Sequence, residues 1–223
     1  MNKYALIPND VKTIIFDWDG TLHESLYIYK PAFLEAYSYL EKHRYVEKYD
    51  WNDLEIASFL GRNPKEMWET FKPKLSNDII NKVSSIISEY MLELIKQGKA
   101  KLYEGALDVL KELKEAGYML VYLSNSKNYY MEAMKNTFAL DKYFDSFYCS
   151  QMYNYIPKPN ILGRIKKSFP QKMLMIGDRR LDIDTGIENG AYTIGCLYGY
   201  GSKEELKYAN EKINSISELI LNL

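Results

Sequence analysis

The chain has 223 residues, enough for one large domain or for a core domain with a smaller insertion. Its 29 Lys and Arg against 30 Asp and Glu leave a net charge of -1, so charge gives no reason to expect nucleic acid or an anionic membrane as a partner. The two cysteines, Cys149 and Cys196, are too few for a disulfide framework and lie in apolar runs, which predicts buried free thiols.

The first predicted element is a buried strand from Val11 to Phe16, in which apolar and β-branched residues predominate. Directly after it come Asp17 and Asp19, and Gly20 allows the backbone to turn sharply behind them. In an open α/β sheet, ligands bind at the carboxyl ends of the strands. One aspartate could attack an electrophile while the other transfers a proton, and together they could hold a hard divalent cation. The alternative is an Asp-rich turn that caps the next helix.

The stretch from about Tyr27 to Gly98 has apolar residues at helical spacing and no convincing strand pattern. Proline suits the first turn of a helix, so a helix is expected to begin near Pro31 and to continue through Leu40. Further start and stop signals predict helices at 53–60, from 64 through 71, and at 77–98. A block of helices between one strand and the rest of the sheet indicates a separate lid.

From Lys101 onward, predicted helices and strands alternate, which is typical of a parallel α/β sheet. Helices are expected at 107–116, 128–138, 159–169, 181–188 and 215–223, and strands at 118–123, 144–149, 173–176 and 192–197. The predicted fold class is therefore α/β. A Rossmann-like parallel sheet core would comprise residues 1–22 and 99–223, and an inserted all-helical cap domain would comprise residues 23–98.

Polar side chains follow three further predicted strands. Ser124 and Asn125 follow the second strand, where a hydroxyl and backbone N–H groups at a helix N-terminus suit phosphate, although an ordinary helix N-cap has the same sequence. Lys158 lies between two prolines, whose stiff backbone could aim a cation; a solvent-exposed loop lysine is the alternative. Asp178 ends the fourth strand, and Asp182 follows one helical turn later. So many neighbouring carboxylates are costly unless Mg²⁺ lies among them.

The order of these motifs along nearly the whole chain resembles the haloacid dehalogenase-like hydrolase superfamily. The DxDGT motif of that superfamily is present as Asp17 to Thr21, its strand ending in Ser or Thr as Ser124, its basic residue as Lys158, and its GDxxxD motif as Gly177 to Asp182. The later segments 197–202 and 215–219 are similar to the phosphoglycolate phosphatase-like subfamily, and the helical insertion resembles the cap domain of that subfamily.

This resemblance implies a Mg²⁺-dependent phosphatase that hydrolyses a small phosphorylated metabolite, either phosphoglycolate-like or a sugar phosphate monoester. Asp17 would form an aspartyl-phosphate that water then hydrolyses. Asp19 would protonate the leaving oxygen and later activate that water. Asp17, the main-chain carbonyl of Asp19 and Asp178 would hold Mg²⁺, with Asp182 binding it directly or through water.

The resemblance also implies which groups would meet the charge of the transferring phosphoryl group. These are Mg²⁺, the ammonium of Lys158, the hydroxyl of Ser124, and backbone N–H groups near Gly20, Thr21 and Asn125. In the cap, Arg62 could contact a second anionic group of the substrate, because its guanidinium suits carboxylates and phosphates. A loop arginine that faces solvent is an equally good interpretation of Arg62.

Other activities of the superfamily are less consistent with the sequence. Dehalogenases lack the second aspartate, which is present here as Asp19. A phosphonate hydrolase would need a cap lysine that forms a Schiff base, and nothing in the sequence marks Lys30 or another cap lysine as buried. A sugar phosphomutase shares all of the motifs and stays open as an alternative, as does a binding protein that kept the fold and lost turnover.

The chain departs from the family pattern after the first motif. The family often has Leu-x-Asp-Ser, whereas this chain has Leu22-His23-Glu24-Ser25. The longer side chain of Glu24 makes a substrate role for it doubtful, and a structural role is the preferred interpretation of His23. Trp18 is expected to pack beneath the loop, and Arg179 and Arg180 are not assigned to the substrate.

The sequence also leads to expectations about partners and location. No apolar stretch approaches the ~18 residues that span a bilayer, and residues 1–10 contain no apolar core of a signal peptide. We therefore expect a cytoplasmic monomer or homodimer whose partner is a small phosphorylated metabolite, with no nucleic acid and no membrane.

Overall fold

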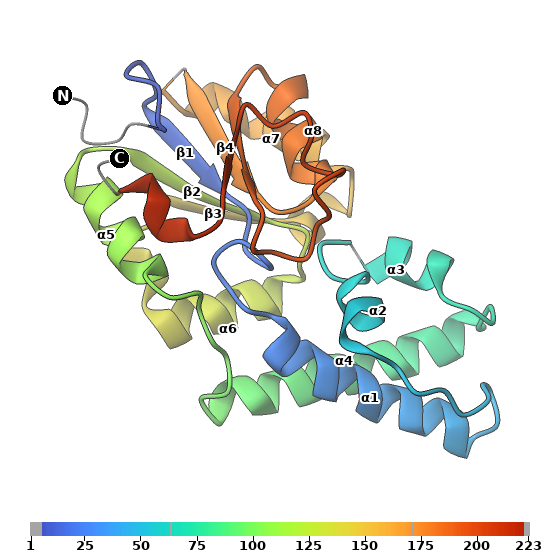
Figure 1. Cartoon of the computed structure of the whole chain (residues 1–223). Coiled ribbons are helices and arrows are strands. Elements are labelled where there is room, and N and C mark those ends of the chain that lie inside the picture. Colours follow the sequence, from blue (N-terminus) through green and yellow to red (C-terminus); the bar gives the residue numbers. More distant parts are fainter. Residues whose placement is uncertain (1–5, 63, 171, 221–223) are drawn as a thin grey trace. The chain divides into compact units, whose positions relative to one another are not determined.

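The computed structural model describes residues 6–62, 64–170 and 172–220 (Figure 1). It consists of two compact units. The first, here called the core unit, comprises Met1–Glu24 and Leu102–Leu223, and the second, the helical unit, comprises Ser25–Lys101.

The core unit is built on a six-stranded parallel sheet with the strand order β3-β2-β1-β4-β5-β6. Figure 1 shows β1, β2 and β4 as neighbouring strands. The carboxyl ends of parallel neighbours lie at one edge of the sheet, so the residues that follow these three strands are brought together. The strands are β1 (Thr13–Phe16), β2 (Met119–Ser124), β3 (Ser146–Cys149), β4 (Met173–Gly177), β5 (Tyr192–Cys196) and β6 (Glu211–Ile213).

Both faces of the central strands are buried, which explains their nearly continuous apolar sequences. Successive side chains of a strand point to opposite faces. On one face, Ile15 packs in a cluster with Ile161 and Leu162 of α7. From the other face of β1, Phe16 makes an edge contact with Phe144. The helices of the core unit are α5 (Ala106–Glu115), α6 (Asn128–Phe138), α7 (Lys158–Ile165) and α8 (Arg180–Glu188), with short 3₁₀ turns at Leu140–Lys142, Ser150–Tyr153, Lys166–Ser168 and Ile216–Leu219.

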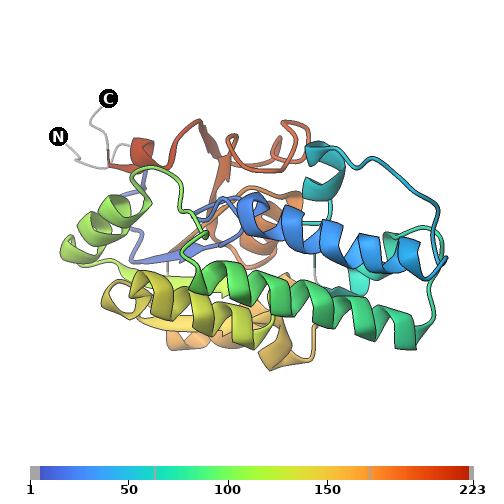
Figure 2. The same ribbon diagram turned by 90° about the horizontal axis from the view of Figure 1, so that it is seen from below.

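The helical unit contains α1 (Leu26–Lys42), α2 (Asp53–Ala57), α3 (Pro64–Thr70) and α4 (Asn77–Lys96). The long helices α1 and α4 lie side by side (Figure 2). Aromatic rings fill the space between the helices and the loop that precedes α2: Trp51 contacts Phe33, Tyr37 and Phe71. No strand occurs among the described residues of this unit, which leave out position 63. The α/β class with a helical insertion, predicted from the sequence, is confirmed.

Three local predictions were wrong. Helix α1 begins at Leu26 rather than at Pro31, because proline removes only one backbone hydrogen bond while residues on both sides of it, such as Ile28 and Phe33, are buried. The short strand β6 was not predicted, since only Ile213 of its residues is buried. The expected helix at 215–223 is a single 3₁₀ turn, Ile216–Leu219, and residues 221–223 of that prediction lie outside the described part.

Two further expectations concern burial. Cys149 and Cys196 are buried free thiols, as predicted. Within the described residues, none of the helices combines the length and the apolar character that crossing a bilayer requires.

Candidate active site

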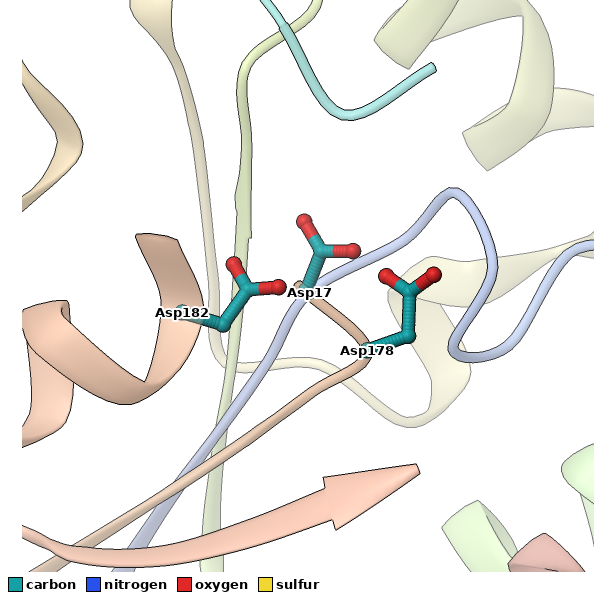
Figure 3. A group of neighbouring side chains, drawn as sticks. All are labelled: Asp17, Asp178 and Asp182. Carbon is teal, nitrogen blue, oxygen red and sulfur yellow. The ribbon is translucent and has the colours of Figure 1, made fainter. Parts of the chain in front are cut away.

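Three buried carboxylates meet at the carboxyl ends of the two central strands. Asp17 directly follows β1, Asp178 follows β4, and Asp182 lies in the first turn of α8. One carboxylate oxygen of each residue lies within 4.8 Å of one oxygen of each of the other two. Figure 3 shows the carboxyl group of Asp17 between those of Asp178 and Asp182, with Asp182 extending from a helix and the other two from loops. This arrangement follows from the pairing of β1 with β4, which places Ile176 beside Phe16.

The ammonium group of Lys158 joins two of these carboxylates. Its Nζ lies 2.5 Å from Oδ1 of Asp17 and 2.6 Å from Oδ1 of Asp182. The Lys158 side chain is only 1% exposed, so the loop lysine facing solvent is excluded. The second proline of the Pro-Lys-Pro sequence lies in the first turn of α7, where it costs no helical hydrogen bond. Lys158 therefore starts this helix, and its side chain points into the acidic group.

Burial governs the titration of these groups. Loss of hydration and the neighbouring Asp182 raise the pKa of Asp17 to about 7, although Lys158 acts in the opposite direction. Burial and the neighbouring carboxylates of Asp17 and Asp182 raise the pKa of Asp178 well above its usual range. For Lys158, burial alone would lower the pKa, but Asp17 and Asp182 raise it above its usual range. A charged lysine is thus held among carboxylates that are costly to ionise together.

Asp178 has an unused acceptor. Its Oδ2 accepts a hydrogen bond of 2.6 Å from the backbone N–H of Tyr200. Its Oδ1 is buried and has no hydrogen-bond partner within the part of the chain that the structure describes. A buried carboxylate oxygen without a donor is costly, and a hard cation is the ligand that such oxygens accept. The donor set of Asp17, Asp178 and Asp182 therefore fits Mg²⁺.

The loop of the first motif is held closely against Asp178. Gly20 has a φ of +85°, and a Cβ at this position would collide with the Asp178 carboxylate and with the ring of Tyr200. The hydroxyl of Tyr198 donates to the Thr21 carbonyl at 2.8 Å, which ties the segment after β5 to the same loop. Only glycine accommodates both the backbone conformation and the close approach. Sequence reasoning gave Tyr198 and Tyr200 no role of their own.

Asp19 has different surroundings from Asp17. Its carboxylate is not part of the group of three. Its Oδ1 accepts a 2.6 Å hydrogen bond from the hydroxyl of Tyr130 in α6 and lies 3.5 Å from Nδ1 of His23. Sequence reasoning missed Tyr130, which has the spacing of an ordinary apolar residue of a helix. That the main-chain carbonyl of Asp19 binds a metal stays a prediction.

The predicted phosphate-binding residues of the core unit lie at the ends of β1 and β2. Ser124 is the last residue of β2, and both it and Asn125 are buried. The Thr21 hydroxyl donates to Oδ2 of Asp17 over 3.4 Å. Arg62 belongs to the helical unit, where its Nε–H donates to the Ser58 carbonyl at 3.2 Å. The substrate contacts assigned to these residues stay predictions.

The remaining residues of the motifs have structural contacts. The ring of Trp18 is fully buried and stacks on His23, which agrees with the expected packing beneath the loop. Arg179 forms an ion pair with Glu205 at 3.0 Å, and Arg180 forms one with Asp184 at 3.3 Å. Neither arginine is needed to explain the acidic group.

A parallel α/β sheet that gathers a lysine and several carboxylates at the ends of its central strands has the side chains that phosphoryl-transfer enzymes use. The profile of the haloacid dehalogenase-like hydrolase family matches residues 14–196, so the chain belongs to this family. The resemblance inferred from the motifs is confirmed.

Individual relatives agree with this assignment. Phosphoglycolate phosphatase of Vibrio parahaemolyticus is 26% identical over 221 residues, which are 95% of this chain and 95% of that protein. Pyrophosphatase PpaX of Bacillus mycoides is 23% identical over 192 residues, 84% of each chain. The structure of a predicted phosphoglycolate phosphatase from Haemophilus somnus has the same fold, with a TM-score of 0.77, 20% identity, and coverage of 95% of this chain and 97% of that one. The chain is thus an enzyme of the phosphatase type.

Proposed function

We propose that the protein is a Mg²⁺-dependent phosphatase that hydrolyses a small phosphorylated metabolite through an aspartyl-phosphate on Asp17. The observation that carries this proposal is the contact of 2.5 Å between Asp17 and the buried Lys158, beside an Asp178 oxygen that lacks a donor. A phosphatase needs a nucleophile, a cation for the phosphoryl oxygens and an oxygen site for a metal ion. These three requirements are met by adjacent side chains of the core unit.

The reaction consists of two displacements at phosphorus. In the first, an Asp17 carboxylate oxygen forms a bond to phosphorus while the ester P–O bond breaks, and Asp19 gives its proton to the departing alcohol. In the second, water attacks the same phosphorus, Asp19 takes a proton from this water, and the bond between Asp17 and phosphorus breaks to release inorganic phosphate. Lys158 and the Ser124 hydroxyl would bind the phosphoryl oxygens in both steps.

Mg²⁺ would be held by carboxylate oxygens of Asp17 and Asp178 and by the Asp19 main-chain carbonyl. Both oxygens of Asp182 already accept hydrogen bonds, one from Lys158 at 2.6 Å and one from the Arg179 N–H at 3.0 Å. Asp182 therefore holds the lysine and would reach the ion through water. When bound, Mg²⁺ offsets the negative charge that the phosphoryl group brings to these carboxylates.

The substrate would be phosphoglycolate or a sugar phosphate monoester, and the enzyme would act in the cytoplasm. Support for this substrate class comes from the phosphoglycolate phosphatase of V. parahaemolyticus, which aligns with nearly the whole chain. Arg62 of the helical unit would contact a second anionic group of the substrate, because a guanidinium pairs well with carboxylates and phosphates. Replacing Arg62 by Gln should raise KM more for phosphoglycolate, which has a carboxylate, than for a phosphate ester without a second charge.

Release of inorganic phosphate from a panel of small phosphate monoesters tests the proposal. The panel is assayed with Mg²⁺ and with a chelator, for the wild type, Asp17→Asn and Asp184→Asn. The control residue Asp184 is an aspartate of α8 that pairs with Arg180 outside the acidic group. We expect release that depends on Mg²⁺, that Asp17→Asn abolishes and that Asp184→Asn leaves unchanged.

Two other results would contradict the proposal. Transfer of phosphate between sugar hydroxyls without net release would indicate a phosphomutase. Binding of phosphate esters by folded wild type without either reaction would indicate a binding protein.

A further inference from the structure

The hydroxyl of Tyr130 makes a direct contact with the second aspartate of the motif. Tyr130 lies in the first turn of α6 and is 4% exposed. Its hydroxyl donates to Oδ1 of Asp19 at 2.6 Å. Hydrogen bonds to a carboxylate are shorter and stronger than bonds between neutral groups, so this contact restricts rotation of the Asp19 carboxyl group.

His23 fixes the direction of the tyrosine proton. Its Nδ1 lies 3.0 Å from the hydroxyl oxygen of Tyr130, and its ring is fully buried against Trp18, 5.6 Å between ring centres and 12° between ring planes. A tyrosine hydroxyl has a single proton, and Asp19 accepts it. The hydrogen bond with His23 therefore requires the imidazole proton to be on Nδ1, which donates it to the tyrosine oxygen. The resulting chain of donors runs from His23 through Tyr130 to Asp19.

We propose that Tyr130 is a positioning residue that aims the Asp19 carboxyl group at the leaving oxygen, with His23 holding the hydroxyl. This inference rests on the proposed role of Asp19 as proton donor. Oδ1 is oriented by the tyrosine, so the proton that Asp19 transfers is on Oδ2. Free rotation of the carboxyl group would exchange the two oxygens and reduce the time that the proton points toward the substrate.

A purely structural tyrosine would act differently. It would stabilise α6 or the loop of the first motif and would affect all substrates alike. A residue that acts through the proton donor affects a substrate in proportion to the need of its leaving group for a proton. An aliphatic alkoxide is a poor leaving group and needs the proton, whereas p-nitrophenolate leaves readily without it. The dependence on the leaving group therefore separates the two roles.

The experiment compares Tyr130→Phe with the wild type on two substrates. These are the aliphatic phosphate monoester that ranks first in the panel above and p-nitrophenyl phosphate. The quantity to compare is kcat/KM, because in a two-step mechanism it reports the steps up to departure of the alcohol and excludes the later attack of water. We expect kcat/KM to fall roughly 10- to 100-fold for the aliphatic ester and less than about threefold for the aryl ester.

Tyr129→Phe is the matched control. It makes the same chemical change at the neighbouring position of α6, where the ring of Tyr129 lies beside the ammonium group of Lys127. We expect both kcat/KM values of this variant to equal those of the wild type. His23→Leu removes the donor to the tyrosine oxygen and serves as a second variant, which should show the same selective loss even if Tyr130→Phe fails to fold.

The outcomes are distinguishable. An equal loss on both esters by folded Tyr130→Phe or His23→Leu, with an active wild type, overturns the positioning role and leaves the proposed function standing. The absence of a loss on either ester does the same, because the ratio of the two kcat/KM values is then also unchanged. A wild type that hydrolyses neither ester overturns the proposed function, and this inference falls with it.

Discussion

Asp17 and Asp19 are two residues apart in one loop, yet the structure surrounds them with different groups. Asp17 is buried and bound to a charged lysine, in a group formed by Asp17, Lys158, Asp178 and Asp182 that we call the lysine side. The Asp19 side chain is 17% exposed and bound to a hydroxyl and an imidazole; Asp19, Tyr130 and His23 form the tyrosine side. The two carboxylates become suited to two tasks because their surroundings differ. The lysine side surrounds Asp17 with charged groups, whereas the tyrosine side orients the Asp19 carboxyl group through hydrogen bonds.

The largest expected effect comes from replacing the two aspartates themselves. Asp17→Asn removes the nucleophile, so phosphate release should fall by at least about 10⁴-fold, or about 5.5 kcal/mol, on every ester. Asp19→Asn removes the proton donor of the first step and the base of the second, so kcat/KM, which reports only the first, should fall less for p-nitrophenyl phosphate than for an aliphatic ester. Steady-state kinetics on both substrates checks this. Equal losses for both variants on both esters would show that the two aspartates do not have separate tasks.

The second effect concerns the stability of the lysine side without Mg²⁺. Lys158→Met leaves the carboxylates of Asp17 and Asp182 buried without their cation, which should lower the free energy of unfolding by about 3–5 kcal/mol. Lys30→Met is the matched control, because Lys30 forms an ion pair of the same 2.5 Å length with Asp53, but at the surface. Its cost should be below about 1 kcal/mol. Urea denaturation in the presence of a chelator measures both, and equal costs would contradict the importance of burial.

Much of the lysine side could be predicted from the sequence, and the reason is topological. Asp17 and Asp178 each follow an apolar strand, and parallel neighbouring strands bring such residues to one edge of the sheet. Sequence spacing alone therefore predicts that they meet. The α/β class follows from the same alternation of strands and helices. The spacing did not predict whether Lys158 is buried or exposed, since buried and exposed lysines have the same sequence pattern.

The tyrosine side could not be predicted in the same way. Tyr130 is one of 21 scattered tyrosines, and its position in α6 has the spacing of any buried residue of an amphipathic helix. Its contact with Asp19 joins positions 111 apart in the sequence and depends on how α6 packs. His23 was interpreted as structural, and the structure places it against Trp18 and Tyr130. Packing, rather than periodicity, determines such contacts. The strand β6 was missed for a similar reason, because its sequence has no pattern of buried residues.

The third effect tests whether the lysine side is a metal site. Burial and the neighbours Asp17 and Asp182 raise the pKa of Asp178 in the folded state, so the folded protein binds that proton more tightly than the unfolded chain. Without metal, this group's contribution to stability should therefore decrease as pH rises from about 3.9 toward the folded pKa. Mg²⁺ at 100 times its Kd should stabilise the wild type by about 2.7 kcal/mol.

Asp178→Asn separates the two contributions. Metal-free, the variant should be at least as stable as the wild type at pH 7, because Asn has no carboxyl group whose ionisation burial opposes. It should gain far less stability from Mg²⁺, since one of the proposed ligands is weakened. Thermal unfolding with and without Mg²⁺ measures both differences. A wild type that Mg²⁺ does not stabilise, or a variant stabilised equally, would contradict the metal site.

The smallest effect concerns the support of the lysine side. Glu205 binds Arg179 at 3.0 Å and the Arg180 N–H at 3.3 Å, which holds the start of α8, the helix that carries Asp182. Partial burial alone would raise the pKa of Glu205, but Arg179 and backbone N–H groups together lower it. A lowered pKa means that the contribution to stability is present above the unfolded pKa of about 4.3 and is lost as pH falls through the folded pKa.

Glu205→Gln should therefore reduce the free energy of unfolding by about 0.5–1 kcal/mol at pH 7, a value kept small by solvent screening of the partly exposed pair. The difference from the wild type should vanish in acid, below the folded pKa of Glu205. Glu204→Gln is the control, because the partner of Glu204 is Lys207 at the surface. Urea denaturation across the pH range measures both variants. A deficit of Glu205→Gln that persists in acid would mean that packing, and not the charge of Glu205, supports the start of α8.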